Sequence, residues 1–389
     1  MSINKETLFA AVESLYERYL DVWEDICNIE SPSRYKEGID ACSAYLVKLA
    51  EEYGWKVERR AFEEAGDAVC ITMNADVDAR PISFSGHLDT VHPLGSFGTP
   101  ACRRDEKNLY GPGVTDCKGG VVVGLLAMAA LDKCGWRGRP VQMILQTDEE
   151  VGSRLSKRGT IEFMAEKSRD AVAFLNLEGG SKGEICVQRK GIHTFTFHVH
   201  GQEAHSSQCA SHGANAIIEA AHKMLEIDAI EKDEPNGLTC CCSIVSGGTV
   251  PNTVPGECTF KVNVRFANEE QRLWIVNKMQ EIAAKNYNPG CTTEVTFGRG
   301  RVAMERHPRN LALLDTINGI LARNGMETLT GFMRYGGSDA ADMTVAGIPA
   351  LDNFGVWGEK IHSPEEYGEL RSLAEMAKVL AIVAVEIEG

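Results

Sequence analysis

Residues 85–93 read SGHLDTVHP and follow a short apolar run, which places His87 and Asp89 two positions apart at the end of a predicted strand. Side chains two positions apart on an extended chain point to the same side. Asp89 can therefore orient the imidazole of His87, which is the support that a metal-bound histidine usually requires. A simple turn residue is the alternative interpretation of Asp89. The stretch predicts a metal-binding strand end.

Further acidic and imidazole side chains also come just after apolar runs. In an α/β sheet, the side chains that follow the carboxyl ends of the strands converge on one cleft. Oxygen and imidazole ligands without thiolate suit zinc, and manganese or cobalt are also compatible. One carboxylate is then left to bridge two ions, so the pattern predicts a hydrolase with two metal ions. The residues that share this placement are Asp116, Glu149, Glu150, Glu178 and His362.

Asp116 lies in the turn LYGPGVTD, directly before the apolar helix predicted over 119–133. An aspartate at such a position is commonly a helix cap. The glycines and proline of this turn permit unusual backbone angles, which favours a side chain that is aimed at a site. We therefore predict that Asp116 is the carboxylate that bridges both ions.

Asp148, Glu149 and Glu150 follow the apolar run QMILQT. Three consecutive acids would normally form a solvated turn, because repulsion between buried carboxylates is costly. Two dications remove that objection. We assign Glu149 as the general base that accepts a proton from the attacking water and Glu150 as a metal ligand.

Glu178 and His362 complete the predicted ligand set. Glu178 ends the run AVAFLNL and precedes two glycines, and a surface strand end is its alternative interpretation. His362 lies in KIHSPEEY, in a loop before the last predicted helix, and would complete the second metal site. His92 has no partner that the sequence indicates.

The composition bounds the function. At 389 residues the chain exceeds the size of one hydrophobic core, so two domains are expected. A net charge of -15 makes nucleic acid and anionic membrane surfaces unsuitable partners. The 13 cysteines lack the paired spacing of a disulfide framework, which favours reduced thiols in the cytoplasm. The N-terminal stretch is interrupted by glutamates, so we expect an amphipathic helix there rather than a signal peptide or membrane span.

The spacing of apolar residues divides the chain into two regions with different orders of predicted strands and helices. Strands and helices alternate up to residue 190, which indicates an α/β sheet with helices on its faces, and residues 300–389 return to the same pattern. Residues 191–299 instead follow the order β-α-β-β-α-β of an inserted ferredoxin-like domain. Strands are predicted over 56–60, 68–74, 82–85, 141–147, 171–177, 193–201, 239–245, 258–266 and 293–297, and helices over 39–53, 119–133, 158–166, 214–227, 269–285, 311–324 and 372–387.

Several stretches, in this order, resemble the two-zinc peptidases and deacylases that include glutamate carboxypeptidase (carboxypeptidase G), succinyl-diaminopimelate desuccinylase, acetylornithine deacetylase, peptidase T and aminoacylase. The likeness spans nearly the whole chain, and GRGRVAM and YGGSDAADM are most similar to the carboxypeptidase G branch. The matching stretches are SGHLDTVHP, LYGPGVTDCKGG, TDEEVGS, LNLEGG, GQEAHSS, GGTVPNTVP, VNVRF, YGGSDAADM and IHSPEEY.

The resemblance implies a zinc-peptidase catalytic domain, over 1–190 and 300–389, with a central mixed sheet flanked by helices. It also implies that the ferredoxin-like domain over 191–299 forms a homodimer. One zinc would be held by His87, Asp116 and Glu178, and the other by Asp116, Glu150 and His362.

The resemblance further implies roles around the ions. Glu149 becomes the base and Asp89 its supporting carboxylate, and His205 reaches across the dimer to stabilise the oxyanion. The positions that match substrate-binding residues are Arg265, Asn252, Gly336, Gly337 and Ser338. Arg265 suits a terminal carboxylate because a guanidinium can pair with it through two hydrogen bonds.

These implications favour hydrolysis of an amide bond in a small peptide or N-acyl amino acid with a free carboxylate, of the glutamate carboxypeptidase type. One residue departs from that branch, because the peptidases of the family favour aspartate at the position of Glu178 and the deacylases favour glutamate. Deacylation of an acetyl or succinyl amino acid is therefore the alternative. A dimer that binds a small acid without catalysis is a third, minor hypothesis.

Overall fold

The computed structural model describes residues 3–233, 237–298 and 300–388, so Arg299 of the GRGRVAM stretch lies outside the described residues. Contacts divide the chain into two compact units. The first unit is discontinuous and comprises Met1–Val187, Arg306–Met333 and Ser338–Gly389. The second comprises Gln188–Glu305 and Arg334–Gly337.

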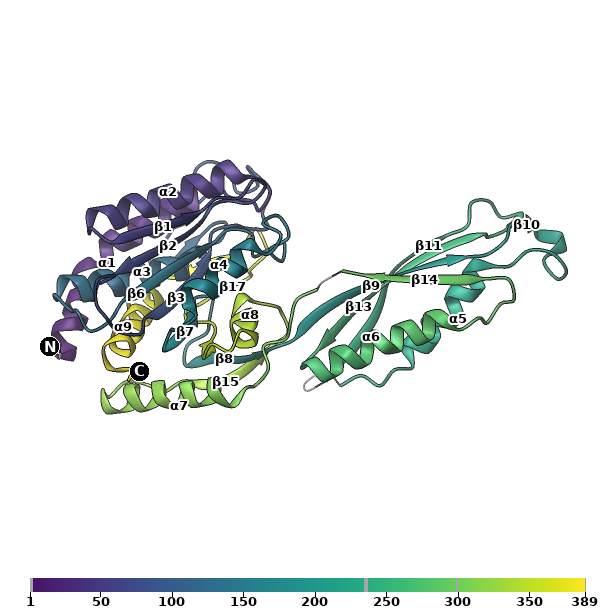
Figure 1. Cartoon of the computed structure of the whole chain (residues 1–389). Helices are drawn as coiled ribbons and strands as arrows, with labels where there is room; N and C mark the ends of the chain where they lie inside the picture. Colours follow the sequence, from purple (N-terminus) through teal and green to yellow (C-terminus); the bar gives the residue numbers. More distant parts are fainter. Residues whose placement is uncertain (1–2, 234–236, 299, 389) are drawn as a thin grey trace. The chain divides into compact units, whose positions relative to one another are not determined.

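A six-stranded mixed sheet is the centre of the first unit (Figure 1). Its first three strands in spatial order are antiparallel neighbours, and β6, β3, β7 and β16 run parallel. Strand β2 alternates between two cores, because Val69 and Ile71 face one side of the sheet and Ala68 and Cys70 face the other. In spatial order the strands are β1 (Lys56–Arg60), β2 (Ala68–Met73), β6 (Val141–Gln146), β3 (Ile82–His87), β7 (Ala173–Asn176) and β16 (Ala350–Leu351).

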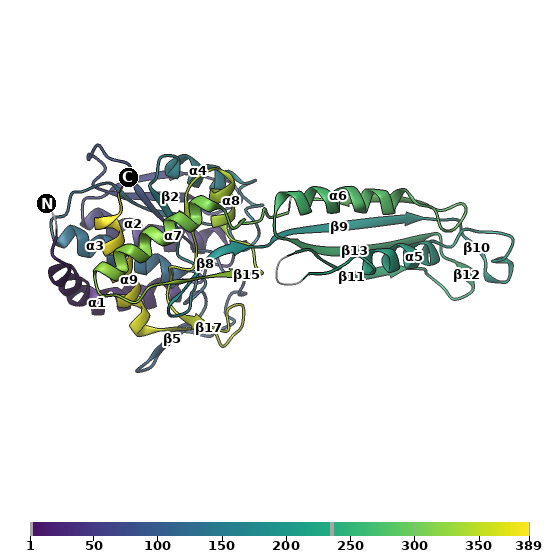
Figure 2. The same ribbon diagram turned by 90° about the horizontal axis from the view of Figure 1, so that it is seen from below.

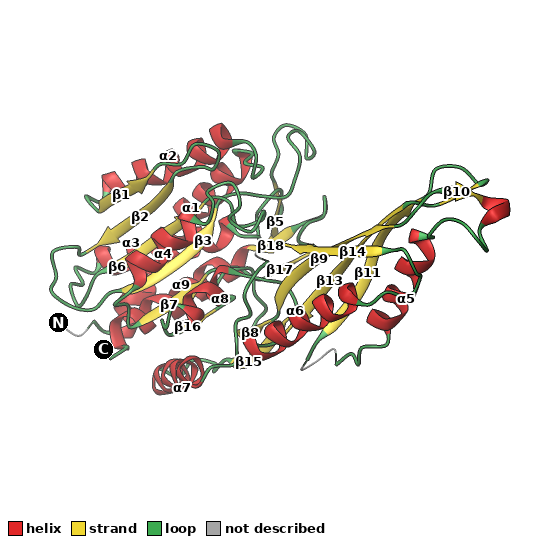
Figure 3. Ribbon diagram, turned by 45° about the vertical axis from the view of Figure 1, so that its right-hand side comes forward, coloured by secondary structure: helices red, strands yellow, loops and turns green. Residues whose placement is uncertain are grey.

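Helices cover both faces of this sheet (Figure 3). The larger core packs beneath α1 (Lys5–Asn28), α2 (Lys36–Glu52), α3 (Lys118–Lys133), α7 (Pro308–Arg323) and α9 (Leu370–Glu386). The smaller core lies against α4 (Gly159–Ser168) and α8 (Asp339–Val345). Strands buried on both faces are expected to be almost entirely apolar, as β2 and β7 are.

The parallel strands determine where the polar side chains converge. His87 is the last residue of β3 and lies opposite Gln146 of β6, while Ser85 lies opposite Asn176 of β7. The residues that follow these strands therefore share one edge of the sheet. Glu149 and Glu150 follow β6, and Glu178 follows β7.

A small four-stranded sheet brings two loops together at this edge. Strand β18 (Tyr367–Glu369) pairs with β5 (Asn108–Tyr110), and β17 (Gly358–Glu359) and β4 (Arg103–Arg104) flank them. This pairing places the IHSPEEY loop beside the turn LYGPGVTD. The chain crosses from one unit to the other within the paired strands β8 (Glu184–Arg189) and β15 (Thr330–Arg334), and also after Glu305 and after Gly337.

The second unit is an antiparallel sheet with two helices on one face (Figure 2). Phe195, Phe197 and Val199 of β9 alternate toward the helices and form the core of this unit. In chain order the elements are β9 (Gly191–His200), α5 (Ala216–Asp228), β11 (Thr239–Gly247), β13 (Glu257–Phe266), α6 (Glu269–Ala284) and β14 (Thr292–Phe297), with the sheet order β11-β13-β9-β14. The predicted ferredoxin-like order is confirmed, and with it the α/β fold class.

A short pair of strands extends from the second unit, in which β10 (Ala204–His205) pairs with β12 (Thr253–Val254). Helix η1 (Ser206–Gln208) follows β10. Among the described residues of both units, every helix is too short or too polar to cross a membrane.

Candidate metal centre

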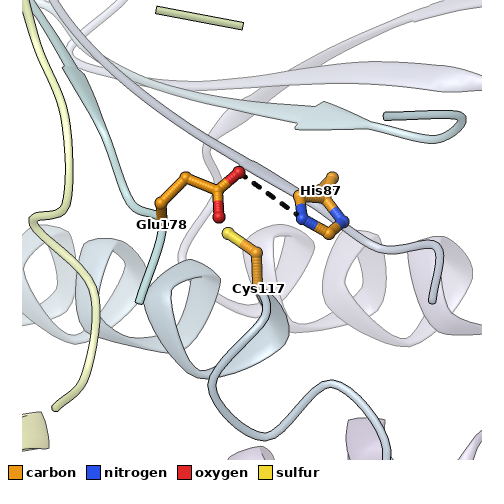
Figure 4. A group of neighbouring side chains, drawn as sticks. All are labelled: His87, Cys117 and Glu178. Atoms are coloured by element: carbon orange, nitrogen blue, oxygen red, sulfur yellow. Dashed lines mark ion pairs between the residues drawn. The ribbon is translucent and has the colours of Figure 1, made fainter. Parts of the chain in front are cut away.

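His87 is fixed by its own neighbours on the chain. Its Nδ1 atom lies 2.9 Å from the backbone oxygen of Asp89, and because a carbonyl can only accept, Nδ1 carries the proton. The other ring nitrogen, Nε2, lies 2.9 Å from Oδ1 of Asp116. It also lies 3.6 Å from Oε1 of Glu178, and Figure 4 marks this ion pair. His87 is 2% exposed, so this nitrogen faces a buried group of carboxylates rather than solvent.

Asp116 lies between two histidines from distant parts of the chain. Its Oδ1 atom faces His87, and its Oδ2 atom lies 3.1 Å from Nε2 of His362. Burial opposes ionisation of Asp116, but the hydrogen bonds to His362 and His87 outweigh it and hold the pKa of the carboxyl well below its usual range. Asp116 therefore has the geometry of a bridging ligand, with one oxygen toward each imidazole.

The three consecutive acids after β6 have different partners. Asp148 accepts hydrogen bonds from the backbone N–H of Ser156 at 2.8 Å and from the hydroxyl of Thr160 at 2.8 Å, so it shapes the turn. Glu149 is 7% exposed, and its negative charge adds to burial in raising the pKa of both Glu150 and Glu178. Glu150 lies 3.3 Å from Nε2 of His362 through Oε2.

Asp89 connects His87 to this turn. Its Oδ1 accepts the backbone N–H of Glu149 at 3.0 Å, and its Oδ2 accepts that of Glu150 at 3.1 Å. The hydroxyl of Ser33 donates to the same Oδ2 at 2.7 Å. With no exposed surface, Asp89 acts as a support that fixes the base candidate and a ligand candidate together.

Among the described residues of this cluster, the four acids Asp89, Asp116, Glu150 and Glu178 outnumber the two imidazoles that they face, His87 and His362. Burial raises the pKa of Glu150 to about 7, although His362 donates to it. Burial and the negative charge of Asp116 raise the pKa of Glu178 well above its usual range. Hydrogen bonds to Asp116 and Glu150 raise the pKa of His362 to about 10. Protons therefore balance the negative charge of these carboxylates in the place of metal cations. The set of imidazole and carboxylate ligands fits two dications.

Two groups of ligand atoms converge closely enough to hold an ion, within the ranges that the structure describes. One consists of His87, Asp116 and Glu150, and the other of His87, Cys117 and Glu178 (Figure 4). Burial raises the pKa of the Cys117 thiol well above its usual range, and the thiol donates to the backbone oxygen of Leu177 at 3.2 Å. A cysteine binds a metal ion as the thiolate, and the raised pKa keeps Cys117 protonated. Asp116 therefore suits an ion better than the neighbouring Cys117.

Comparison with known proteins gives the family of this chain. Residues 83–386 match the model of the peptidase family M20/M25/M40. The chain belongs to this family. Its membership confirms the predicted resemblance and the assignment as a metallopeptidase or amidohydrolase.

Individual M20 relatives resemble the chain over most of its length. Carboxypeptidase G2 of Pseudomonas sp. (strain RS-16) is 26% identical over 98% of this chain and 92% of its own. Succinyl-diaminopimelate desuccinylase of Bradyrhizobium sp. (strain BTAi1 / ATCC BAA-1182) is 24% identical over 86% of this chain and 90% of its own. The aminopeptidase PepT of Bacillus cereus ATCC 10987 has a similar fold, with a TM-score of 0.80 and 21% identity over 95% of this chain and 98% of that one.

His205, predicted to be catalytic, and Asn252, predicted to bind substrate, lie together in the second unit. His205 on β10 pairs with Thr253 of β12, and Thr253 is the residue that follows Asn252. The backbone oxygen of Asn252 accepts the N–H of Ser206 at 2.9 Å, and the ring of His205 bonds to the hydroxyl of Ser207 at 2.8 Å. Both side chains are exposed, as residues that contact a substrate or a second copy need to be.

Arg265 lies on β13, and its guanidinium donates to the backbone oxygen of Tyr335 at 3.2 Å. This contact places it beside Gly336, the next residue. Burial lowers the pKa of Arg265. A Cβ on Gly337 would lie 2.4 Å from Cδ of Arg301, so this flexible side chain would have to shift to admit it.

Ser338 has a structural partner set of its own. Its hydroxyl donates to Asp352 at 2.6 Å, accepts from Asn176 at 3.0 Å, and accepts the backbone N–H of Ala340 at the start of α8. The side chain is 1% exposed. Its hydroxyl is therefore engaged in the packing of α8 against the end of β7.

Glu366 and His92 form a buried pair that the sequence does not predict. Their side chains meet at 3.0 Å although 274 positions separate them in the chain. Glu366 follows a second glutamate in IHSPEEY, and the sequence offers no means of telling which of the two is buried. The only available signal was the position of His92 in SGHLDTVHP.

Proposed function

We propose that this protein hydrolyses an amide bond in a small peptide or N-acyl amino acid that carries a free carboxylate, with a preference of the glutamate carboxypeptidase type. The observation that supports this most directly is Asp116, whose two oxygens face His87 and His362 from opposite ends of the chain. The likeness to carboxypeptidase G2, which extends over 98% of this chain, also supports the proposal.

In this proposal, two divalent ions bind at the carboxylate cluster. His87, Asp116 and Glu178 would hold one, and Asp116, Glu150 and His362 would hold the other. Zinc suits this mixture of imidazole and carboxylate ligands best, and cobalt or manganese is compatible. The ions would supply Lewis acidity toward the scissile carbonyl and would make water more acidic.

The residues around the ions divide the remaining work. Glu149 accepts a proton from the attacking water and delivers it to the leaving nitrogen. Asp89 keeps His87 and the Glu149 turn in register through the hydrogen bonds described above. His205, from the other copy in a homodimer, donates a hydrogen bond to the developing oxyanion.

Substrate binding is assigned to the second group of residues. Arg265 pairs with the free carboxylate of the substrate, and its burial strengthens such a pairing because fewer water molecules compete. Asn252 and the turn of Gly336, Gly337 and Ser338 hold the remaining polar atoms. Since the hydroxyl of Ser338 is already bonded within α8, this turn contributes through its backbone.

We also propose that residues 191–299 form the homodimer interface, that residues 1–190 and 300–389 form the catalytic domain, and that the protein acts in the cytoplasm. Strand β11 is an edge strand whose Ile244 and Val245 are each 57% exposed. Helix α5, which packs beside β11, exposes Leu225. Apolar side chains on an open sheet edge suit pairing with a second copy. The 13 cysteines lack the paired spacing of a disulfide framework, as is typical of proteins in a reducing compartment.

Deacylation of an acetyl or succinyl amino acid is the second candidate. Glu178 favours it, since the deacylases of the family have glutamate at this position. A relative named as a desuccinylase also covers most of the chain. Both reactions use the same ions and base, and they differ only in which side of the amide bond the enzyme recognises.

A substrate panel tests these functions. The protein, loaded with zinc, cobalt or manganese, is given dipeptides with C-terminal glutamate, the same dipeptides with an amidated C-terminus, and acetyl and succinyl amino acids. We expect cleavage of the free dipeptides and little cleavage of the amidated ones, because Arg265 loses its partner. Turnover of the acyl amino acids alone would establish the deacylase. Filled metal sites without any amide cleavage would indicate the small-acid-binding dimer.

A further inference from the structure

Glu366 is a buried carboxylate whose hydrogen bonds are all directed at the surroundings of the metal centre. It is 1% exposed. Its Oε1 accepts the backbone N–H groups of Thr115 at 2.8 Å and Asp116 at 3.0 Å. Its Oε2 accepts the N–H of Gly113 at 3.2 Å and lies 3.0 Å from Nε2 of His92, which donates because a carboxylate only accepts.

Each of these contacts reaches a segment that carries a candidate ligand. Gly113, Thr115 and Asp116 form the turn that presents the Asp116 carboxylate. His92 belongs to the stretch that begins at the ligand His87. Glu366 itself follows His362 by four residues, and its N–H bonds to the backbone oxygen of Ser363 at 3.1 Å, within the same loop.

We propose that Glu366 is a positioning residue that holds the segments of His87, Asp116 and His362 in the geometry that binds the metal ions. This inference rests on the proposed metal-dependent function. Asp89 has the matching task for Glu149 and Glu150. Two buried carboxylates, neither of them a ligand, thus organise the ligand-bearing loops from two sides.

The chemistry requires a carboxylate at this position. All four groups that face Glu366 are donors, and each carboxylate oxygen accepts two of them. A glutamine has one acceptor oxygen and one donor NH₂ group. In Glu366→Gln the NH₂ group would face the N–H of Gly113 or of Thr115 and Asp116, so a buried donor would lose its partner.

Glu366→Gln is compared with Glu365→Gln, the same chemical change one residue away. Glu365 is exposed and bonded to Lys360, so it is a matched control. Dissociation constants for Zn²⁺ and Co²⁺ are measured on the full chain by competition with a chromophoric chelator. We expect metal affinity to fall about 10- to 100-fold in Glu366→Gln and to change less than about twofold in the control. With saturating metal, most of kcat returns and KM is unchanged, which a general loss of folding would not produce.

A second variant covers the case in which Glu366→Gln does not fold, which circular dichroism of the metal-free chain would reveal. His92→Leu removes one donor and leaves the three backbone hydrogen bonds. We expect a smaller loss of metal affinity than in Glu366→Gln. Affinity unchanged in a folded Glu366→Gln, or in His92→Leu when the former is unfolded, would overturn the inference.

The outcomes also separate this inference from the proposed function. If the parent chain takes up two ions but cleaves no amide, the proposed reaction is wrong, and the Glu366 comparison still decides the positioning role. If amides are cleaved and Glu366→Gln retains full metal affinity, only the positioning role is wrong. A parent chain that binds no ion would contradict both.

Discussion

At the scale of single residues, the position of an acid in the sequence says little about its task. Asp148, Glu149 and Glu150 are consecutive, yet the first shapes a turn, the second lies near the carboxylate cluster and the third contacts His362. What separates them is the set of donors that each one meets after β6 ends. Substitutions at adjacent positions are therefore expected to have effects of different kinds.

Glu149→Gln is expected to lower kcat by about 10²- to 10⁴-fold, because the amide cannot accept the proton of the attacking water. Metal content should stay at the level of the parent chain, since Glu149 is not in the proposed ligand set. Steady-state kinetics at saturating zinc and metal analysis of the same sample provide the measurements. A near-normal rate at full metal loading would remove Glu149 from the proposed mechanism.

Metal uptake by the metal-free protein is expected to release protons. The pKa of His362 is raised to about 10 and that of Glu150 to about 7, so both side chains carry protons near neutral pH. Metal ions must displace these protons in order to bind. The affinity should therefore rise with pH, through about 7 for Glu150 and further for His362. Calorimetric titration with zinc in buffers of different ionisation enthalpy counts the protons. Heats that do not depend on the buffer would contradict this expectation.

His87, Glu149, Glu150 and Glu178 could be chosen as candidates from the sequence because each follows a recognisable apolar run, whereas Asp116 and His362 were chosen from the turn and loop in which they lie. Glu366 could not be predicted, because its importance depends on donors that come from 250 and more positions away. Cys117 differs from Glu366 because its position in the sequence, beside a candidate ligand, would suggest a metal-binding role. It lies next to Asp116 and close to His87, but the partner that engages its thiol, Leu177, is remote in sequence.

At the scale of elements, α3 is the helix on which the metal centre depends most. It begins two residues after Asp116, and Gly120 in its first turn lies against the end of β7. A Cβ at Gly120 would lie 1.8 Å from the backbone oxygen of Leu177, the residue before Glu178. Helix α3 therefore approaches the sheet as closely as a glycine allows.

Gly120→Ala is expected to destabilise the protein by about 1–3 kcal/mol, because backbone must move away from the added methyl group. The shift of Leu177 should also weaken metal binding through Glu178. Gly319→Ala in α7 is the matched control, since a Cβ there meets nothing within 4 Å. That variant should gain up to about 1 kcal/mol from helix propensity. Thermal melting of both variants gives the signs, and equal shifts would contradict the argument.

The elements differed in how well periodicity predicted them. Long helices and core strands, such as α3 and β9, were predicted to within a few residues because their apolar spacing extends over several turns or pleats. The small sheet of β4, β5, β17 and β18 was not predicted. Its strands are two or three residues long, too short to show alternation, and pairing partners such as Tyr110 and Tyr367 are far apart in the chain.

At the scale of the whole molecule, the two edges of the second unit's sheet are expected to behave differently. Ile244→Lys and Leu225→Glu, made as separate variants, each place a charge on the apolar surface of β11 and α5 and should convert a dimer to a monomer, since burying an unpaired charge in an interface is costly. Thr296→Lys on β14, the opposite edge strand, should leave the dimer intact. Light scattering after gel filtration measures the mass. A parent chain that is already monomeric, or β11 variants that remain dimeric, would contradict the proposed interface.

The discontinuity of the first unit has a consequence for protein synthesis. Strand β16 must pair with β7, and α9 must cover α1 and α3, but Gln188–Glu305 is translated in between. A nascent chain therefore exposes the apolar side of α3 on the ribosome while the inserted unit is already complete enough to fold. At about 5–20 residues per second, the ribosome needs roughly 4–16 s more to supply the final helix. During that interval the half-built sheet exposes apolar surface and an unpaired strand edge, which are the features that make partly folded chains prone to aggregate.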